Sequence, residues 1–316
     1  MKLSRRHHYL PKMYLRGFAD ESERVWVYNR QNNSYIHQGV MNTAVKRDFY
    51  TIRDPDGQKS DEIEKVIADI ESWTKPIIER FDTGDLTVGG DDRAVVSLFV
   101  VLLMTRTPAF DTSYRSYEEQ AGRWRMKNMT STVAAAEEML RGFEKATGID
   151  MSDVTAQEMY ESIRDDNYEV EIPRQNSIKA MMELALDGAE AVRRMNWGVT
   201  AAPKGTAYIT CDSPVTVVPP SFLGNSQKYG MLTPGAWTFV PLSGKTMLHF
   251  RDFGGCTLAI PGSRDFVRHV NLMVAANSEQ FAIARDEPLL RSLVRRGGLN
   301  LWQQEPRLKF TAPQAQ

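Results

Sequence analysis

The spacing of hydrophobic residues predicts helices in the middle of the chain and strands towards both of its ends. From about residue 60, apolar residues recur every three or four positions, which is typical of the buried face of a helix. Residues 94–104 are apolar on nearly all sides, and this predicts a helix buried in the core. Strand-forming residues predominate instead in 24–52 and in short runs between 208 and 284. We therefore expect an α+β fold, with a mixed or antiparallel sheet of N- and C-terminal strands covered by a helical middle segment.

The same pattern predicts one domain rather than two. At 316 residues the chain can bury a large core, whereas the N-terminal strand segment is too short to form a core alone. We expect a single elaborated domain over residues 1–305, in which about 60–195 form a helical insertion or cap. Residues 306–316 are expected to be a flexible tail.

Composition and charge exclude several classes of protein. The formal net charge of −1 argues against a protein that coats nucleic acid by charge alone, but it does not exclude a local basic groove. Two cysteines are too few for a disulfide framework or a thiolate zinc site. The longest apolar run, residues 94–104, is well short of the roughly 20 residues that cross a bilayer. We expect a cytoplasmic protein that does not associate with a membrane.

The N-terminal segment holds the first candidate residues for chemistry. The sequence has no P-loop, G-x-G-x-x-G, H-E-x-x-H, C-x-x-C or G-x-S-x-G motif, which excludes the commonest nucleotide, zinc and hydrolase classes. His7 and His8 stand side by side before Pro11, which favours an extended conformation in the residue preceding it. Apolar residues at helical spacing follow and would fix this lead-in against a core. An imidazole held in this way has the fixed direction that acid–base or metal chemistry requires. The alternative is a pair of surface histidines at a frayed end.

Asp212 is the best candidate inside the chain, within Thr210-Cys211-Asp212-Ser213-Pro214. It follows a predicted strand, and carboxylates at strand ends are often functional. Asp212 could bind a metal, orient His8 or act as a general base. The alternative is an Asx-turn, in which the carboxylate caps backbone N–H groups near Pro214.

Arg106 and two glutamates complete the set of candidates. Arg106 ends the apolar helix and needs an anionic partner, which could be Asp212 or a bound phosphate. Glu64 and Glu71 lie two turns apart on one face of the first long helix and could enter a cleft with His8. Two carboxylates and a histidine could hold a divalent ion. The alternative is that both glutamates are solvated.

Several short motifs occur in a recognisable order along nearly the whole chain. They are His8-x-x-Pro11-x-x-x-Leu15-x-x-Phe18, Val25-Trp26-Val27-Tyr28-Asn29-Arg30, Arg47-Asp48-Phe49-Tyr50, Arg106-Thr107-Pro108, Tyr208-Ile209-Thr210-Cys211-Asp212-Ser213-Pro214-Val215 and Val240-Pro241-Leu242-Ser243. In this order they resemble the microbial domain-of-unknown-function family four-two-three-eight. The resemblance implies a full-length member in which the acid of a Ser/Thr-x-Asp-x-Pro element falls on Asp212. It implies no reaction.

These residues lead to two functional hypotheses. The first is a nuclease-like hydrolase of phosphodiesters, acting in conflict between microbes and mobile elements, with nucleic acid or a nucleotide as substrate. His8 would then be a base or ligand, Asp212 a ligand or orienter, and Arg106 a phosphate clamp. A divalent metal would be held by His8, Asp212 and Glu71. The second is a non-enzymatic binding or interaction protein, in which the same residues build a buried polar network.

Overall fold

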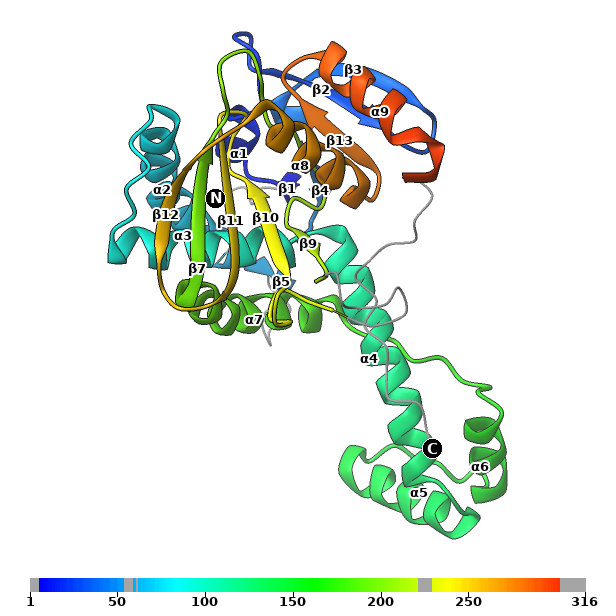
Figure 1. The fold of residues 1–316 in the computed structure, drawn as a ribbon. Helices are drawn as coiled ribbons and strands as arrows, with labels where there is room; N and C mark the ends of the chain where they lie inside the picture. Colours follow the sequence, from blue (N-terminus) through cyan, green and yellow to red (C-terminus); the bar gives the residue numbers. More distant parts are fainter. Residues whose placement is uncertain (1–5, 54–58, 61, 221–228, 302–316) are drawn as a thin grey trace. The chain divides into compact units, whose positions relative to one another are not determined.

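The computed structural model describes residues 6–53, 59–60, 62–220 and 229–301. The chain divides into two compact units (Figure 1). The first unit takes in the chain up to Phe110 and again from Ile178, and the second runs from Asp111 to Ser177. The sequence predicted one domain with an insertion at 60–195, and much of that range belongs to the first unit. The predicted tail at 306–316 lies outside the described residues.

A four-stranded antiparallel sheet joins the two ends of the chain. In spatial order its strands are β3 (Ser34–Gly39), β2 (Arg24–Asn29), β13 (Phe281–Ala284) and β8 (Thr210–Cys211). Strand β13, from the C-terminal part of the chain, therefore lies between β2 and β8. The α+β fold is confirmed, and in this sheet N- and C-terminal strands pair as expected.

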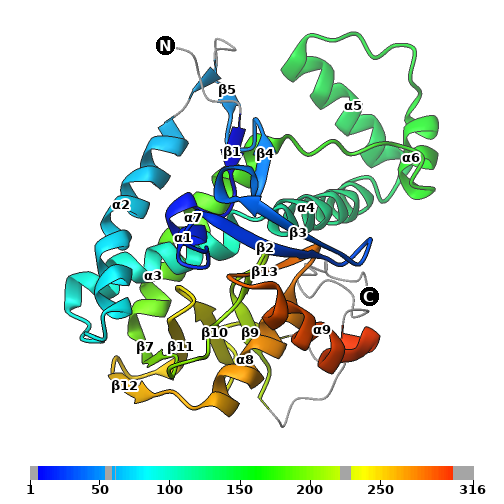
Figure 2. The same ribbon diagram turned by 90° about the horizontal axis from the view of Figure 1, so that it is seen from above.

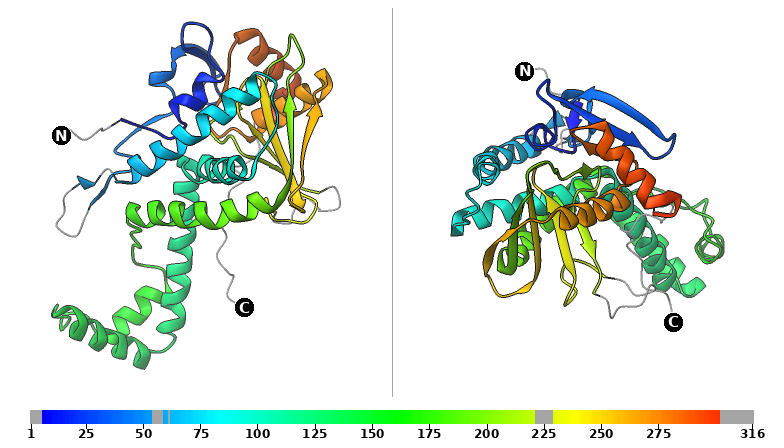
Figure 3. Two further views of the ribbon diagram at one scale, coloured as in Figure 1. Left: turned by 90° about the vertical axis from the view of Figure 1, so that its left-hand side faces the viewer. Right: turned by 45° about the horizontal axis from the view of Figure 1, so that its top comes forward.

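A second, five-stranded sheet comes from the C-terminal half alone (Figure 3). Its order is β12 (Thr257–Pro261), β7 (Met195–Ala201), β11 (Thr246–Phe253), β10 (Trp237–Pro241) and β9 (Thr216–Val218). The β12–β7 pair is parallel and the other pairs are antiparallel, so the sheet is mixed.

Shorter elements hold the N-terminal segment in place. Strand β1 (Arg6–His8) pairs with β4 (Val45–Arg47), and β5 (Ile52–Arg53) pairs with β6 (Lys59–Ser60). Helix α1 (Lys12–Arg16) follows Pro11, and the 3-10 helix η1 (Val40–Asn42) leads towards β4. The N-terminal lead-in is thus an ordered strand.

Helices of the first unit pack on its sheets and on one another. They are α2 (Glu62–Asp82), α3 (Gly90–Thr105), most of α7 (Arg174–Arg194), α8 (Arg264–Asn277) and α9 (Glu287–Leu301). Helix α3 is buried along most of its length, as its apolar composition predicted. Helices α8 and α9 lie against the four-stranded sheet (Figure 2), and their contact forms a core that includes Tyr28, Ile209, Val270, Ala282 and Leu290.

The second unit contains helices with clear local signals. Helix α4 (Pro108–Met129) begins in the first unit and continues here, followed by α5 (Val133–Thr147) and α6 (Ala156–Arg164). The side chain of Thr132 caps α5, which ends at Gly148 with a φ of 70°. Thr155 and Glu158 form a capping box at the start of α6.

Among the described residues, no single helix combines the length and apolar character needed to span a membrane. The successive helices α3 and α4 reach that length and composition only when they are joined across a bend.

Candidate functional site

Asp212 directly follows strand β8 and is hydrogen-bonded to the turn that precedes β13. Its carboxylate oxygens accept hydrogen bonds from the backbone N–H groups of Glu279, at 2.8 Å, and Gln280, at 2.7 Å. The backbone N–H of Asp212 donates to the carbonyl of Phe281 at 3.2 Å. The carboxylate therefore caps backbone N–H groups, and these belong to a turn far along the chain rather than to the vicinity of Pro214.

Burial gives Asp212 unusual acid–base behaviour. The residue is 5% exposed, and burial raises the pKa of its carboxyl group to about 7, although the backbone hydrogen bonds oppose this shift. The carboxylate lies within electrostatic range of Arg30 and Tyr9. Arg30 also donates a hydrogen bond to the carbonyl of Ser278, in the same turn. Asp212 is a carboxyl group that changes charge near neutral pH, and such groups are candidates for general acids and bases.

Arg106 is held by partners other than Asp212. The side chain is 3% exposed, and each of its three nitrogens donates a hydrogen bond within the protein. Nη1 donates to Glu71 Oε1 at 2.8 Å, and Nη2 donates to the carbonyl of His8 at 2.7 Å. Nε donates to the Tyr50 hydroxyl at 3.1 Å. Of the two partners predicted for Arg106, Asp212 is not the acid that pairs with it, because Glu71 supplies the negative charge.

The imidazole beside this ion pair belongs to His7. Its Nδ1 accepts the backbone N–H of Tyr50 at 2.8 Å, and its Nε2 lies 3.6 Å from a carboxylate oxygen of Glu64. Because Nδ1 accepts, we assign the proton of the neutral ring to Nε2, which faces Glu64. Glu64 and Glu71 do face the N-terminal strand together, but their partners are His7 and Arg106.

His8 points elsewhere, because successive side chains of a strand lie on opposite faces. The backbone carbonyl of His8 serves Arg106, whereas its imidazole lies near the backbone of Val40 and Met41. Burial and the nearby charge of Lys12 lower the pKa of His8. Its Nε2 atom is buried and has no hydrogen-bond partner within the described residues.

The predicted metal ligands do not form one cluster. Glu71 pairs with Arg106, Asp212 caps a turn, and the His8 imidazole lies near η1. Within residues 6–53, 59–60, 62–220 and 229–301, no three His, Cys, Asp or Glu side chains are grouped so that they could hold a metal ion.

The sequence assigned the functional role to His8 rather than to its neighbour His7, and it did not single out Tyr9 or Tyr50 as site residues. Tyr9 and Tyr50 are 6% and 3% exposed, and the stacked rings of His7 and Tyr50 have centroids 5.7 Å apart. The sequence did contain a signal for His7. Residues two apart on a strand lie on the same face, so a buried Tyr9 implies that His7 also faces the core.

Buried hydrogen bonds connect the motifs that are distant in sequence. The hydroxyl group of Tyr14 lies 2.7 Å from Thr210 Oγ1 and donates to the carbonyl of Pro241 at 2.8 Å. The backbone N–H of Gly244 donates to the carbonyl of Gly17 at 2.8 Å. The N-terminal segment, the Asp212 element and the Pro241 strand therefore meet in one core.

The fold and site define an α+β protein with an internally bonded polar network and a buried carboxyl group that titrates near neutrality. The chain belongs to the family described as protein of unknown function (DUF4238), whose model matches residues 6–288. Neither the curated proteins nor the solved structures compared with the chain include a match.

Proposed function

We propose that this is a non-enzymatic binding or interaction protein in which His7, Arg106 and Asp212 form a structural network. The observation that carries the proposal is that the polar atoms of these side chains find their hydrogen-bond partners within the chain. All three guanidinium nitrogens of Arg106 and both carboxylate oxygens of Asp212 are bonded to other parts of the chain. Buried polar groups of structural networks are paired in this way.

The contacts of Arg106 argue against its use as a phosphate clamp. A phosphate would have to displace Glu71 or the His8 carbonyl from Arg106. It would also have to reach a side chain that is only 3% exposed. Removing the carboxylate partner of a buried guanidinium is strongly destabilising. The pairing with Glu71 therefore favours a structural role for Arg106.

The test compares stability with hydrolysis in the purified full chain. Wild type, Arg106→Met and Asp212→Asn are unfolded in urea, and all three are incubated with RNA, DNA and nucleotides in the presence of several divalent ions. We expect no hydrolysis by the wild type and a loss of stability in Arg106→Met. Hydrolysis that a substitution abolishes without a loss of stability would overturn the proposal.

One observation favours a second candidate, hydrolysis of phosphodiesters. Asp212, with a pKa of about 7 and Arg30 close by, has the electrostatic setting of a general base beside a cation. An enzyme of this kind, with a nucleic acid or nucleotide as substrate, would lose activity in Asp212→Asn. Its rate would rise with pH through about 7. A cytoplasmic location, expected from the two cysteines and the short longest apolar run, is part of both proposals.

A further inference from the structure

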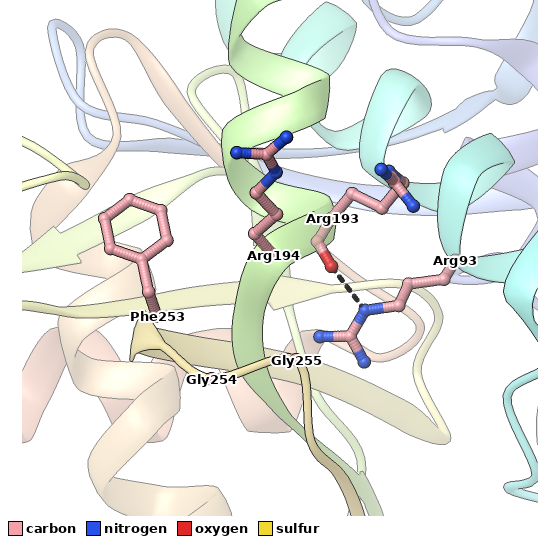
Figure 4. Close-up of a pocket in the computed structure, with 6 residues that line it drawn as sticks. All are labelled: Arg93, Arg193, Arg194, Phe253, Gly254 and Gly255. Atoms are coloured by element: carbon pink, nitrogen blue, oxygen red, sulfur yellow. Dashed lines mark hydrogen bonds between the residues drawn. The ribbon is translucent and has the colours of Figure 1, made fainter.

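A hollow of about 660 Å³ lies in the first unit, where α7 passes into β7 and the turn after β11 comes close. Three arginines, an aromatic ring and two glycines line it: Arg93, Arg193, Arg194, Phe253, Gly254 and Gly255 (Figure 4). Its volume falls within the usual range for small-molecule sites. None of these residues belongs to the network around Arg106 and Asp212.

Arg93 supplies a buried positive charge without a carboxylate partner among the described residues. The residue is 8% exposed, and its Nε donates to the carbonyl of Arg193 at 2.6 Å. Its other hydrogen bonds go to the carbonyls of Met195 and Cys256 and to the hydroxyl of Thr257. Arg93 therefore binds the carboxyl end of α7, where the helix dipole offsets roughly half of one charge.

Arg193 and Arg194 share a single carboxylate. Glu190 lies 2.8 Å from Arg193 Nε and 2.7 Å from Arg194 Nε. Arg193 and Arg194 thus share one carboxylate, and Arg93 binds one helix end, which leaves an excess of about one and a half positive charges. A phosphate monoester carries about −1.5 to −2 charges at neutral pH, which complements this excess. Arg193 and Arg194 are 46% and 68% exposed, so they remain accessible to a ligand.

Phe253 provides an apolar surface beside these charges. Its side chain is 59% exposed, and Figure 4 shows its ring across the hollow from Arg194. The turn that carries it is well fixed, because the N–H groups of Gly254 and Gly255 donate to the carbonyl of Arg194 at 3.0 and 2.9 Å. Gly255 has a φ of 71° and leaves open space where a side chain would stand. An exposed aromatic ring next to arginines suits the stacking of a nucleobase.

We infer that this hollow binds a nucleoside monophosphate, with the phosphate on Arg193 and Arg194 and the base on Phe253. The inference rests on the proposed binding function and names the class of its ligand. The phosphate supplies the negative charge that balances the arginines, and the base covers the Phe253 ring, which water otherwise contacts.

The experiment is calorimetric titration of the full chain with AMP, adenosine and inorganic phosphate. We expect AMP to bind, and adenosine and phosphate each to bind at least about tenfold more weakly. Arg193→Ala with Arg194→Ala, and separately Phe253→Ala, should each weaken AMP binding about tenfold or more. Matched controls are Arg141→Ala and Phe143→Ala, exposed residues of α5 outside the hollow.

Three results would overturn the inference: no AMP binding at millimolar concentration, AMP binding that is unchanged by both hollow variants, or phosphate binding as tight as AMP. Each of these leaves the network of Arg106 and Asp212, and therefore the proposed function, untouched. Recovery of the AMP by chromatography distinguishes failure of the inferred binding site from failure of the proposed function. If AMP binds at the hollow but is converted, the binding site stands and the non-enzymatic function fails.

Discussion

His7 and Tyr50 lock the N-terminal strand to the segment after β4. The Nδ1 atom of His7 accepts the backbone N–H of Tyr50 at 2.8 Å, and the two rings stack within 6° of parallel. Tyr50 in turn receives a hydrogen bond from Arg106 and donates one to its carbonyl at 3.2 Å. The N-terminal segment is therefore tied to the end of helix α3 through one histidine and one tyrosine.

His7→Ala should destabilise the protein by about 1–3 kcal/mol, because a buried backbone N–H loses its acceptor. His8→Ala is the matched control, since its imidazole lies on the opposite face of β1, near the backbone of Val40 and Met41 rather than that of Tyr50. Urea unfolding of both variants measures the difference. If His8→Ala were the more destabilising change, the assignment of the structural role to His7 would be wrong.

Glu71→Ala should cost about 3 kcal/mol, since it leaves the buried Arg106 guanidinium without a carboxylate. Combined with Arg106→Met, the loss should be smaller than the sum of the two single losses by about 0.5–3 kcal/mol. A double-mutant cycle in urea gives this interaction energy. Additive losses would show that the pair at 2.8 Å contributes no coupling.

The fold could be predicted to the extent that periodicity was strong. The apolar helix predicted at 94–104 lies within α3, and the strands expected within 24–52 include β2 and β3. Strands β7 and β12 were not predicted. β7 follows α7 directly without a turn residue, and four of the five residues of β12 are exposed at the edge of the sheet. Pairing with neighbours, rather than local pattern, decides such strands.

The site was less predictable, because it depends on distant pairings. The sequence identified Arg106 as a buried cation in need of an anion, and this is confirmed by its pairing with Glu71. It could not tell which acid, since the choice between Glu71 and Asp212 is made by tertiary packing. Between His7 and His8 the difference is one residue of strand alternation, which reverses the face on which the side chain lies.

Gly198→Ala should destabilise the protein by about 1–3 kcal/mol. On the five-stranded sheet Gly198 pairs with His249, whose imidazole occupies the space that a Cβ atom at residue 198 would need. The His249 ring is enclosed by Trp237, Phe239 and Phe266, so it has little room to move.

A second substitution tests this steric explanation. Because His249→Ala removes the ring, adding Gly198→Ala to that variant should cost much less than it does in the wild type. Urea unfolding of the four proteins measures both steps. An equal cost of Gly198→Ala with and without the imidazole would contradict the explanation.

Asp212→Asn should change how stability depends on pH. Because burial raises the pKa of Asp212 to about 7, the folded protein holds this proton more tightly than the unfolded chain, whose aspartates have a pKa of about 4. The stabilisation is therefore complete below about pH 4 and is lost as the pH rises through about 7. Relative to Asp212→Asn, the wild type should lose on the order of 4 kcal/mol over this range. The charged and titratable neighbours Arg30, Glu279, Tyr9 and Cys211 are the same in both proteins.

Asp85→Asn provides a control of opposite sign. Hydrogen bonds from Thr87 lower the pKa of Asp85, so its contribution is present above about pH 4 and is lost only as the pH falls further. Between about pH 5 and 7 the difference between wild type and Asp85→Asn should therefore stay constant, whereas the difference for Asp212→Asn should fall. Urea unfolding at several pH values measures both curves. A flat difference for Asp212→Asn would mean that the buried carboxyl group is ionised throughout this range, held by the N–H groups of Glu279 and Gln280. Asp212 would then lose the near-neutral titration on which the hydrolase candidate depends.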